Sequence, residues 1–399
     1  MTGLFVMSCG GNKKQSSKDT ERQAPANNIP IDNDLRNRLA DFASKPRMKG
    51  LFAFYVYDLT ADKPVYGCNE RVAIPSASCL KLLSGVAGLD LLGTDYRYLT
   101  SLYTRGRTKG GVLNGDVIFK GGLDPQLNAP ELPTFAKALK KRGIKKFTGK
   151  LIVDLTIKEP VKSEKHWFPW DLSFSKYGIL YKGSDKLTKE LKAAFHNQGF
   201  AVADSQIVLG ATPRGAHLAF KYFRPIDPII HKMWKNSSNT QATSLLYTIG
   251  HRINPKGNFP ATGVDYLHRF MRENLGLHDK SLVVHDGCGL CTYNRLSPFA
   301  LVTILHYGYQ HPAIYKKLQE NLSVSGIDGT LRSELSSPKL RGKIHGKTGT
   351  LSHPFGISSL AGYCESGNGH TLAFSIMDSE MSVLDARVLQ RKLGEELIK

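Results

Sequence analysis

The sequence predicts an α+β fold in which helices flank one antiparallel sheet built from both ends of the chain. Residues 50–59 form an apolar, strand-like stretch, and three more such stretches follow between residues 344 and 377. Helical patterns lie outside them, at residues 34–45 and 382–397. Between residues 100 and 223 the pattern changes to short strand-like runs rich in Gly and Lys, which indicates an insertion.

The opening elements follow from residue spacing. Leu35, Leu39 and Phe42 recur at helical spacing with polar residues between them, which is typical of an amphipathic helix. The strand at residues 50–59 is predicted to pair with residues 65–67, because the turn-forming sequence Asp62-Lys63-Pro64 separates the two.

The next predicted element is a buried helix that begins near Ser76 and carries Ser78 and Lys81 three residues apart. Positions three apart share a helix face, so Lys81 can take the proton of the Ser78 hydroxyl if its amine is neutral. The lysine pKa of about 10.4 must then fall by roughly 3 units, a cost of about 4 kcal/mol. Alone, this spacing is equally well explained by a capping serine and a solvated lysine.

Two later stretches strengthen the catalytic interpretation. Ser237-Ser238-Asn239 precedes an apolar helical run, and Lys347-Thr348-Gly349 precedes strand-like residues. Ser-x-x-Lys, Ser-x-Asn and Lys-Thr-Gly, in this order, form the motif set of the penicillin-recognising serine acyltransferases. The simpler alternatives are that Ser237 and Asn239 cap the following helix, and that residues 347–349 are a strand end and a turn.

The chain resembles the D-alanyl-D-alanine carboxypeptidase/endopeptidase family of class C low-molecular-mass penicillin-binding proteins. Besides the three motifs, the resemblance rests on blocks between about residues 69 and 363: 71–78, 92–97, 115–116 with 122–125, 286–290, 326–331 and 360–363. It implies a transpeptidase domain like that of the serine β-lactamases, with a flanked antiparallel sheet and a helical subdomain. We expect this domain at residues 33–99 and 224–399, with an inserted accessory domain at residues 100–223.

The resemblance also implies a role for each motif residue. Ser78 would be the nucleophile and Lys81 its base, while Ser237 would pass a proton to the leaving amine. Asn239 would hold the substrate amide and contact Lys81. Lys347 would attract the terminal carboxylate of the substrate and help to lower the pKa of Lys81. The remaining expected contacts are carboxylate binding by Thr348 and Thr350, close backbone approach at Gly349, and an oxyanion hole from the N–H groups of Ser78 and Thr350.

The chain departs from the family pattern at several positions. Ser238 stands where Asp is common, Thr243 stands where a glutamate is expected, and Cys288 and Cys291 replace serines. The span between the first two motifs is also short for the family. Cys288 and Cys291 have redox-motif spacing, but we interpret them as small buried thiols. Three family-like carboxylates, Asp124, Asp286 and Asp328, are interpreted as turn formers.

Composition and charge set further limits. The 399 residues are 41% hydrophobic and 22% charged, an ordinary globular mixture, and the formal net charge is +20. Lys and Arg are scattered along the chain without a nucleic-acid-binding motif, so we expect no nucleic-acid partner. A basic face toward anionic envelope polymers fits the charge better, beside the simpler reading of a solvated surface. No run of eighteen apolar residues predicts a membrane-spanning helix.

The first 32 residues are predicted as a lipoprotein-like leader and a flexible tether. Residues 4–11 resemble the end of a bacterial lipoprotein signal, with Cys9 as the lipidated residue. The part before them is too short and lacks basic residues for a full signal, so either the true start lies upstream or the match is accidental. Residues 11–32 are rich in Lys, Gln, Ser, Asn and Pro, as flexible tethers are.

The leading hypothesis is a serine D-Ala-D-Ala carboxypeptidase of the periplasm or cell envelope, with endopeptidase action on peptidoglycan cross-links as an extension. It would act on peptidoglycan stem peptides through an acyl-enzyme on Ser78, would need no metal or cofactor, and would be trapped by β-lactams. Contact with the membrane would come only through a lipid anchor at Cys9. The alternatives are a serine β-lactamase and a non-catalytic peptidoglycan-binding envelope protein. Against the β-lactamase, no convincing glutamate motif lies between Ser237 and Lys347.

Overall fold

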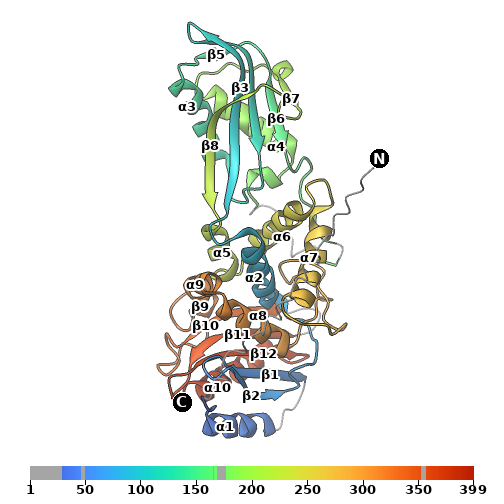
Figure 1. The fold of residues 1–399 in the computed structure, drawn as a ribbon, viewed down its shortest axis with the longest axis vertical. Coiled ribbons are helices and arrows are strands. Elements are labelled where there is room, and N and C mark those ends of the chain that lie inside the picture. The colour runs from blue at the N-terminus through green and yellow to red at the C-terminus, as the bar shows by residue number, and fades with distance from the viewer. Residues whose placement is uncertain (1–28, 46–49, 165, 169–176, 352–355) are drawn as a thin grey trace, which may run out of the picture.

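The computed structural model describes residues 29–45, 50–164, 166–168, 177–351 and 356–399. These residues form an elongated molecule with a β-sheet toward each end and a layer of helices between them (Figure 1). The predicted leader, including Cys9, and most of the predicted tether lie outside the described residues. Within the described part, none of the helices is both long and apolar enough to cross a membrane.

The first sheet joins the two ends of the chain, as the sequence predicts. Its neighbouring strands are all antiparallel, and β1 pairs with β12 from Leu51 opposite Ser379 to Asp58 opposite Leu372. The strand order is β2-β1-β12-β11-β10-β9. The strands are β1 (Leu51–Asp58), β2 (Lys63–Cys68), β9 (Ser323–Val324), β10 (Ile344–Leu351), β11 (Ile357–Glu365) and β12 (Thr371–Ser379).

Helices cover both faces of this sheet. The terminal helices α1 (Asn33–Ser44) and α10 (Val383–Leu397) pack together on one face, where Phe42 meets Phe52 and Phe54 with ring centroids 5.5 and 5.6 Å apart. Alternate strand residues point to the other face, where Tyr55 packs on Phe299 of helix α8 (Pro298–Gln310). The two helices predicted at residues 34–45 and 382–397 therefore share one face of the sheet.

The helical layer surrounds α2 (Leu80–Leu92), whose residues from Leu80 to Leu89 are all buried. The predicted start of this helix near Ser76 is wrong, because a 3₁₀ turn at Ala77–Cys79 precedes it and neither Ser76 nor Ser78 caps it. Ala77 has a φ of 45°, which a right-handed helix excludes. The other helices of the layer are α5 (Asp227–Trp234), α6 (Asn239–Ile253), α7 (Phe259–Glu273), α8 (Pro298–Gln310) and α9 (Pro312–Asn321).

A second sheet occupies the part of the chain in which the sequence places an insertion, and the division into domains remains a prediction. Its order is β7-β6-β4-β3-β8, with β5 beside β4, and helices α3 (Pro133–Lys141) and α4 (Ser184–His196) accompany it. Strands β3 and β8 connect it to the helical layer (Figure 1). The strands are β3 (Arg97–Lys109), β4 (Val112–Gly121), β5 (Lys146–Phe147), β6 (Leu151–Leu155), β7 (Ile207–Leu209) and β8 (His217–Pro225).

The contact between α2 and Trp234 yields a stability prediction. A Cβ at Gly85 would lie 2.3 Å from Cζ2 of Trp234, whose Nε1 donates to the carbonyl of Lys81 at 2.8 Å. Because the indole is fully buried and cannot move away freely, Gly85→Ala should lower the free energy of unfolding by about 1–3 kcal/mol, as measured by urea denaturation.

Gly88 on the same helix is the matched control for this change. Its added Cβ would meet a methyl group of Leu245 at 3.1 Å, and that side chain can rotate. Gly88→Ala should therefore cost less than Gly85→Ala, helped by the higher helix propensity of alanine. Equal urea midpoints for the two variants would contradict the proposed packing.

Candidate active site

Ser78 lies in a 3₁₀ turn that is fixed against strands β10 and β11. The Oγ of Ser359 donates to the Ser76 carbonyl at 2.7 Å, and the Sγ of Cys79 donates to the Lys347 carbonyl at 3.0 Å. A Cβ at Gly349 would lie 2.6 Å from the Ser76 oxygen and 3.0 Å from the Ser78 nitrogen. Only glycine permits this approach, which holds the strand backbone beside the Ser78 N–H.

Lys81 brings its amine to Ser78 in a fully buried position. Its Nζ lies 2.7 Å from Ser78 Oγ, 2.7 Å from Asn239 Oδ1 and 2.6 Å from the carbonyl oxygen of Cys288. Burial lowers the pKa of Lys81, and the ionisable side chains of Cys288 and Asp286 act in the opposite direction. An amide oxygen and a carbonyl oxygen can only accept, so a neutral amine that donates to both has its lone pair left for the Ser78 hydroxyl.

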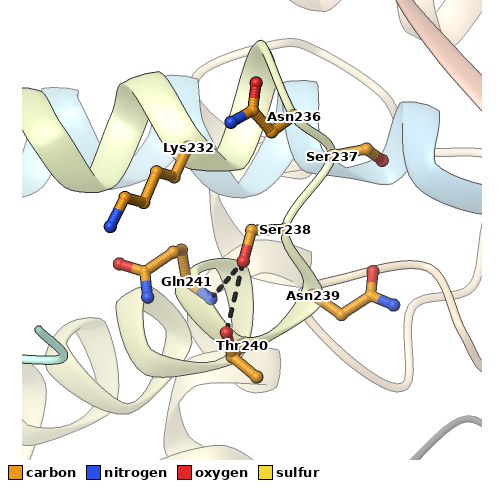
Figure 2. A pocket seen from close by; sticks show the side chains of 7 residues that line it. All are labelled: Lys232, Asn236, Ser237, Ser238, Asn239, Thr240 and Gln241. Atoms are coloured by element: carbon orange, nitrogen blue, oxygen red, sulfur yellow. Dashed lines mark hydrogen bonds between the residues drawn. The ribbon is translucent and has the colours of Figure 1, made fainter. Parts of the chain in front are cut away.

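The Ser-x-Asn motif divides its side chains between two directions. Ser237 and Asn239 project to one side of the loop, while Ser238 and Gln241 project to the other (Figure 2). Ser238 is the N-cap of α6 and accepts from the Gln241 N–H at 3.4 Å. The alternative that Ser237 and Asn239 cap the helix is therefore wrong, because the residue between them takes that role. Ser237 has a φ of 55°, an uncommon conformation for a non-glycine residue.

Lys347 places a second buried amine in the same site. Its Nζ donates to Ser237 Oγ at 2.9 Å and to the Thr348 carbonyl at 2.6 Å. Burial is the larger cause, and repulsion from Lys81 the second, that together lower the pKa of Lys347 to about 7. Two buried amines that repel each other cannot both be charged cheaply, so a change in the protonation of one alters the other.

Four of the eight predicted site residues line a cleft of about 420 Å³. Ser78, Ser237, Thr348 and Thr350 all contribute to its wall. The Oγ1 of Thr348 donates to Thr330 Oγ1 at 2.8 Å, which fixes its orientation. A neighbouring hollow of about 480 Å³ lies along residues 236–241 and is bounded by Lys232 (Figure 2). The fold thus brings all eight predicted site residues together.

A buried carboxylate that the sequence marks only as a turn former shapes the loop that contacts Lys81. Asp286 is 1% exposed, and its loop supplies the Cys288 carbonyl that accepts from Lys81. The sequence could not identify this acceptor, because any residue type provides a carbonyl. Asp286 accepts from the backbone N–H groups of Cys288, Gly289 and Cys291 and from the side chains of Asn294 and Trp167.

The other two family-like carboxylates also make contacts that stabilise the fold. Asp124 accepts from the Gln126 N–H and pairs with Arg224, and Asp328 accepts from the Val324 N–H and pairs with Lys235.

Cys288 and Cys291 are free, buried thiols. Burial raises the pKa of both thiols, that of Cys291 to about 11, which disfavours the reactive thiolate. Among the described residues, no group of three His, Cys, Asp or Glu side chains is placed to hold a metal ion.

With this geometry in view, comparison with known proteins identifies the family. The model of the D-Ala-D-Ala carboxypeptidase 3 (S13) family matches residues 35–178 and 180–395. The chain belongs to this family. The predicted family and the predicted class, a serine peptidase hydrolase, are therefore confirmed.

Two curated relatives match this chain over most of their length, and both are named as D-alanyl-D-alanine carboxypeptidases. The chain is 22% identical to the D-alanyl-D-alanine carboxypeptidase DacB of Haemophilus influenzae, over 87% of this chain and 91% of the relative. It is also 22% identical to a D-alanyl-D-alanine carboxypeptidase of Actinomadura sp., over 87% of this chain and 81% of the relative.

Solved structures confirm the predicted fold. Penicillin-binding protein 4 (dacB) of Haemophilus influenzae superposes with a TM-score of 0.77 at 19% identity, covering 90% of this chain and 99% of that one. A predatory peptidoglycan endopeptidase of Bdellovibrio bacteriovorus gives a TM-score of 0.57 at 16% identity, covering 88% and 92%. At these identities the likeness concerns the fold alone.

The Asp286 contacts predict a large effect of a small substitution. Asp286→Asn keeps the shape but turns one acceptor oxygen into an NH₂ group, which would face N–H donors. We expect the free energy of unfolding to fall by about 2–4 kcal/mol, as measured by urea denaturation. The control is Asp279→Asn, because Asp279 is exposed and, among the described residues, its carboxylate accepts only from Ser281 in its own turn. Equal losses in both variants would show that the Asp286 contacts carry no special weight.

Proposed function

We propose that this protein is a serine D-Ala-D-Ala carboxypeptidase that cleaves peptidoglycan stem peptides, with endopeptidase action on cross-links as an extension. The observation that carries the proposal is the 2.7 Å contact of Ser78 Oγ with the buried Lys81 amine, which also contacts Asn239 and the Cys288 carbonyl. A nucleophile with its base within hydrogen-bond reach is the arrangement that acyl transfer requires.

In the proposed acylation step, neutral Lys81 takes the hydroxyl proton of Ser78 while Oγ attacks the carbonyl carbon of the penultimate D-alanine. The oxyanion would accept from the N–H groups of Ser78 and Thr350, for which the close approach of β10 to the Ser78 nitrogen is the support. The C–N bond then breaks, and the proton that Lys81 took is delivered by way of Ser237 to the departing D-alanine amine, which leaves Lys81 neutral and the Ser237 hydroxyl intact. Water hydrolyses the resulting ester and releases Ser78.

Substrate recognition would couple to base activation. Lys347, Thr348 and Thr350 would bind the terminal carboxylate, and Asn239 would hold the substrate amide. A carboxylate beside Lys347 favours the charged form of that amine. Repulsion between the two buried amines then favours neutral Lys81, so that substrate binding itself would help to produce the base.

The place of action is part of the proposal. We infer a location in the periplasm or cell envelope, with Cys9 as the site of a lipid anchor that would be the only membrane contact. The penicillin-binding protein 4 of Haemophilus influenzae has also been solved in complex with a β-lactam. We infer that this chain likewise forms an adduct with β-lactams at Ser78.

The test of the activity is release of the terminal D-alanine from a soluble muropeptide pentapeptide, followed by chromatography. The parent protein should release it, and Ser78→Ala should release at least about 1,000-fold less, because the nucleophile is lost. Intact mass after exposure to benzylpenicillin should show an adduct on the parent alone. Rapid destruction of the antibiotic without a lasting adduct would favour the β-lactamase alternative, and binding of the muropeptide without cleavage or adduct would favour the binding protein.

The lowered pKa of Lys81 predicts the pH dependence of acylation. The base is active only when neutral, so the rate should rise with pH through the Lys81 pKa, along a limb below the ordinary lysine value of 10.5. With the carboxylate of benzylpenicillin bound beside it, Lys347 is charged and repels Lys81. Lys347→Gln removes this repulsion and should move the midpoint of this limb to higher pH, beside lowering the rate. The measurement is the benzylpenicillin acylation rate between pH 5 and pH 10, and an unchanged midpoint would argue against the coupling.

A further inference from the structure

The positive charge of the chain is concentrated in the second sheet and its helices. Residues 97–225 contain 23 Lys and Arg against 10 Asp and Glu, which is a net charge of +13 out of +20 for the whole chain. This segment contains none of the eight predicted site residues, so catalysis does not explain its charge. An excess concentrated in one part of a protein produces a local field that attracts anions.

Much of this charge gathers at the end of the molecule that lies farthest from the first sheet. Strands β3 and β4 meet there in a hairpin, and the loop after α3 crosses its turn, because the N–H groups of Lys145 and Lys146 donate to the Gly111 carbonyl (Figure 1). We define the basic tip as six exposed residues from the hairpin and this loop: Arg105, Arg107, Lys109, Lys141, Lys145 and Lys146.

The charges of the basic tip are not neutralised by ion pairs among the described residues of the fold. Among the residues that the structure describes, none of the six forms an ion pair, whereas Lys120, Lys186 and Lys192 of the same segment do. Asp116 lies opposite Arg105 in the sheet, but its Oδ1 accepts the backbone N–H of Lys150. Lys141 alone has a local explanation, since it ends α3, where a cation is favourable. The tip is therefore an unneutralised cationic surface.

We propose that the basic tip is an exosite for the carboxylates of polymeric peptidoglycan. This inference rests on the proposed function, because stem peptides supply free carboxylates on a network large enough to reach the tip and the cleft together. Interfacial membrane binding is strengthened by apolar side chains that enter the bilayer. Close to the tip, Leu218 is the only large apolar side chain among the described residues that is markedly exposed, which favours a polymer over a lipid surface. The exosite raises the local concentration of cross-linked substrate and leaves the chemistry at Ser78 unchanged.

The test compares two variants of equal charge in the full-length Ser78→Ala protein, so that no substrate is digested. The tip variant is Arg105→Gln/Arg107→Gln/Lys145→Gln/Lys146→Gln. The control is Lys256→Gln/Arg272→Gln/Lys280→Gln/Lys392→Gln, whose four residues are exposed and lie outside residues 97–225. Binding to purified, lipid-free peptidoglycan sacculi is measured by co-sedimentation at low ionic strength.

The tip variant should bind sacculi about tenfold more weakly than the control, as the loss of four exposed ion pairs predicts. The difference should shrink in 0.5 M salt, where the Debye length falls to about 4 Å. Conversion of the sacculus carboxylates to neutral amides should abolish the difference in binding between the parent and the tip variant. With Ser78 restored, both variants should cleave the soluble pentapeptide as the parent does, and circular dichroism should confirm that both are folded.

Equal binding of the tip variant and the control would overturn the exosite, as would binding that survives amidation of the sacculi. Tighter binding of the parent to phosphatidylglycerol vesicles than to sacculi, lost in the tip variant, would assign the surface to a membrane and also overturn it. Absence of pentapeptide cleavage by the parent would overturn the proposed function instead, and this result is separate from the binding measurements.

Discussion

The site depends on one buried amine. Lys81 has no exposed surface, and its Nζ meets Ser78 Oγ, Asn239 Oδ1 and the Cys288 carbonyl, which come from three distant parts of the chain. Removing an ammonium group from water is costly, and this cost is what lowers the pKa of Lys81. Two acceptors that cannot donate then direct the lone pair of the neutral amine to Ser78. Burial and hydrogen bonding therefore act together to make a weak base useful.

The surrounding structure holds the groups that contact this amine in place. Strand β10 lies against the nucleophile turn because Gly349 has no side chain, and it supplies Lys347 as the second buried amine. Ser238 caps α6 and leaves Asn239 free to reach Lys81. Asp286 accepts from five donors and so fixes the loop that presents the Cys288 carbonyl. Sheet, helix and loop each contribute one constraint.

Strand alternation and helical spacing were enough to predict most of the catalytic half. The apolar stretches at residues 50–59 and 344–377 form one sheet, in which strands from both ends of the chain bury their apolar side chains. The start of α2 was mispredicted, because the contacts of Ser76 and Cys79 with β10 and β11 override local helix preference. The long strands β3 and β8 were not predicted, since their exposed cations and bulky apolar residues give no clean alternation.

The sequence by itself determined the family and the chemical groups, because the spacing and order of three short motifs are preserved in the letters of the chain. It also determined the excess of positive charge. Only the tertiary structure decided which groups meet Lys81, since a backbone carbonyl such as that of Cys288 leaves no trace in residue type. It also decided where the charge gathers, because the hairpin and the loop after α3 become neighbours only when strands β4 and β5 pair. Local patterns encode elements, whereas proximity between distant segments arises only when the chain packs.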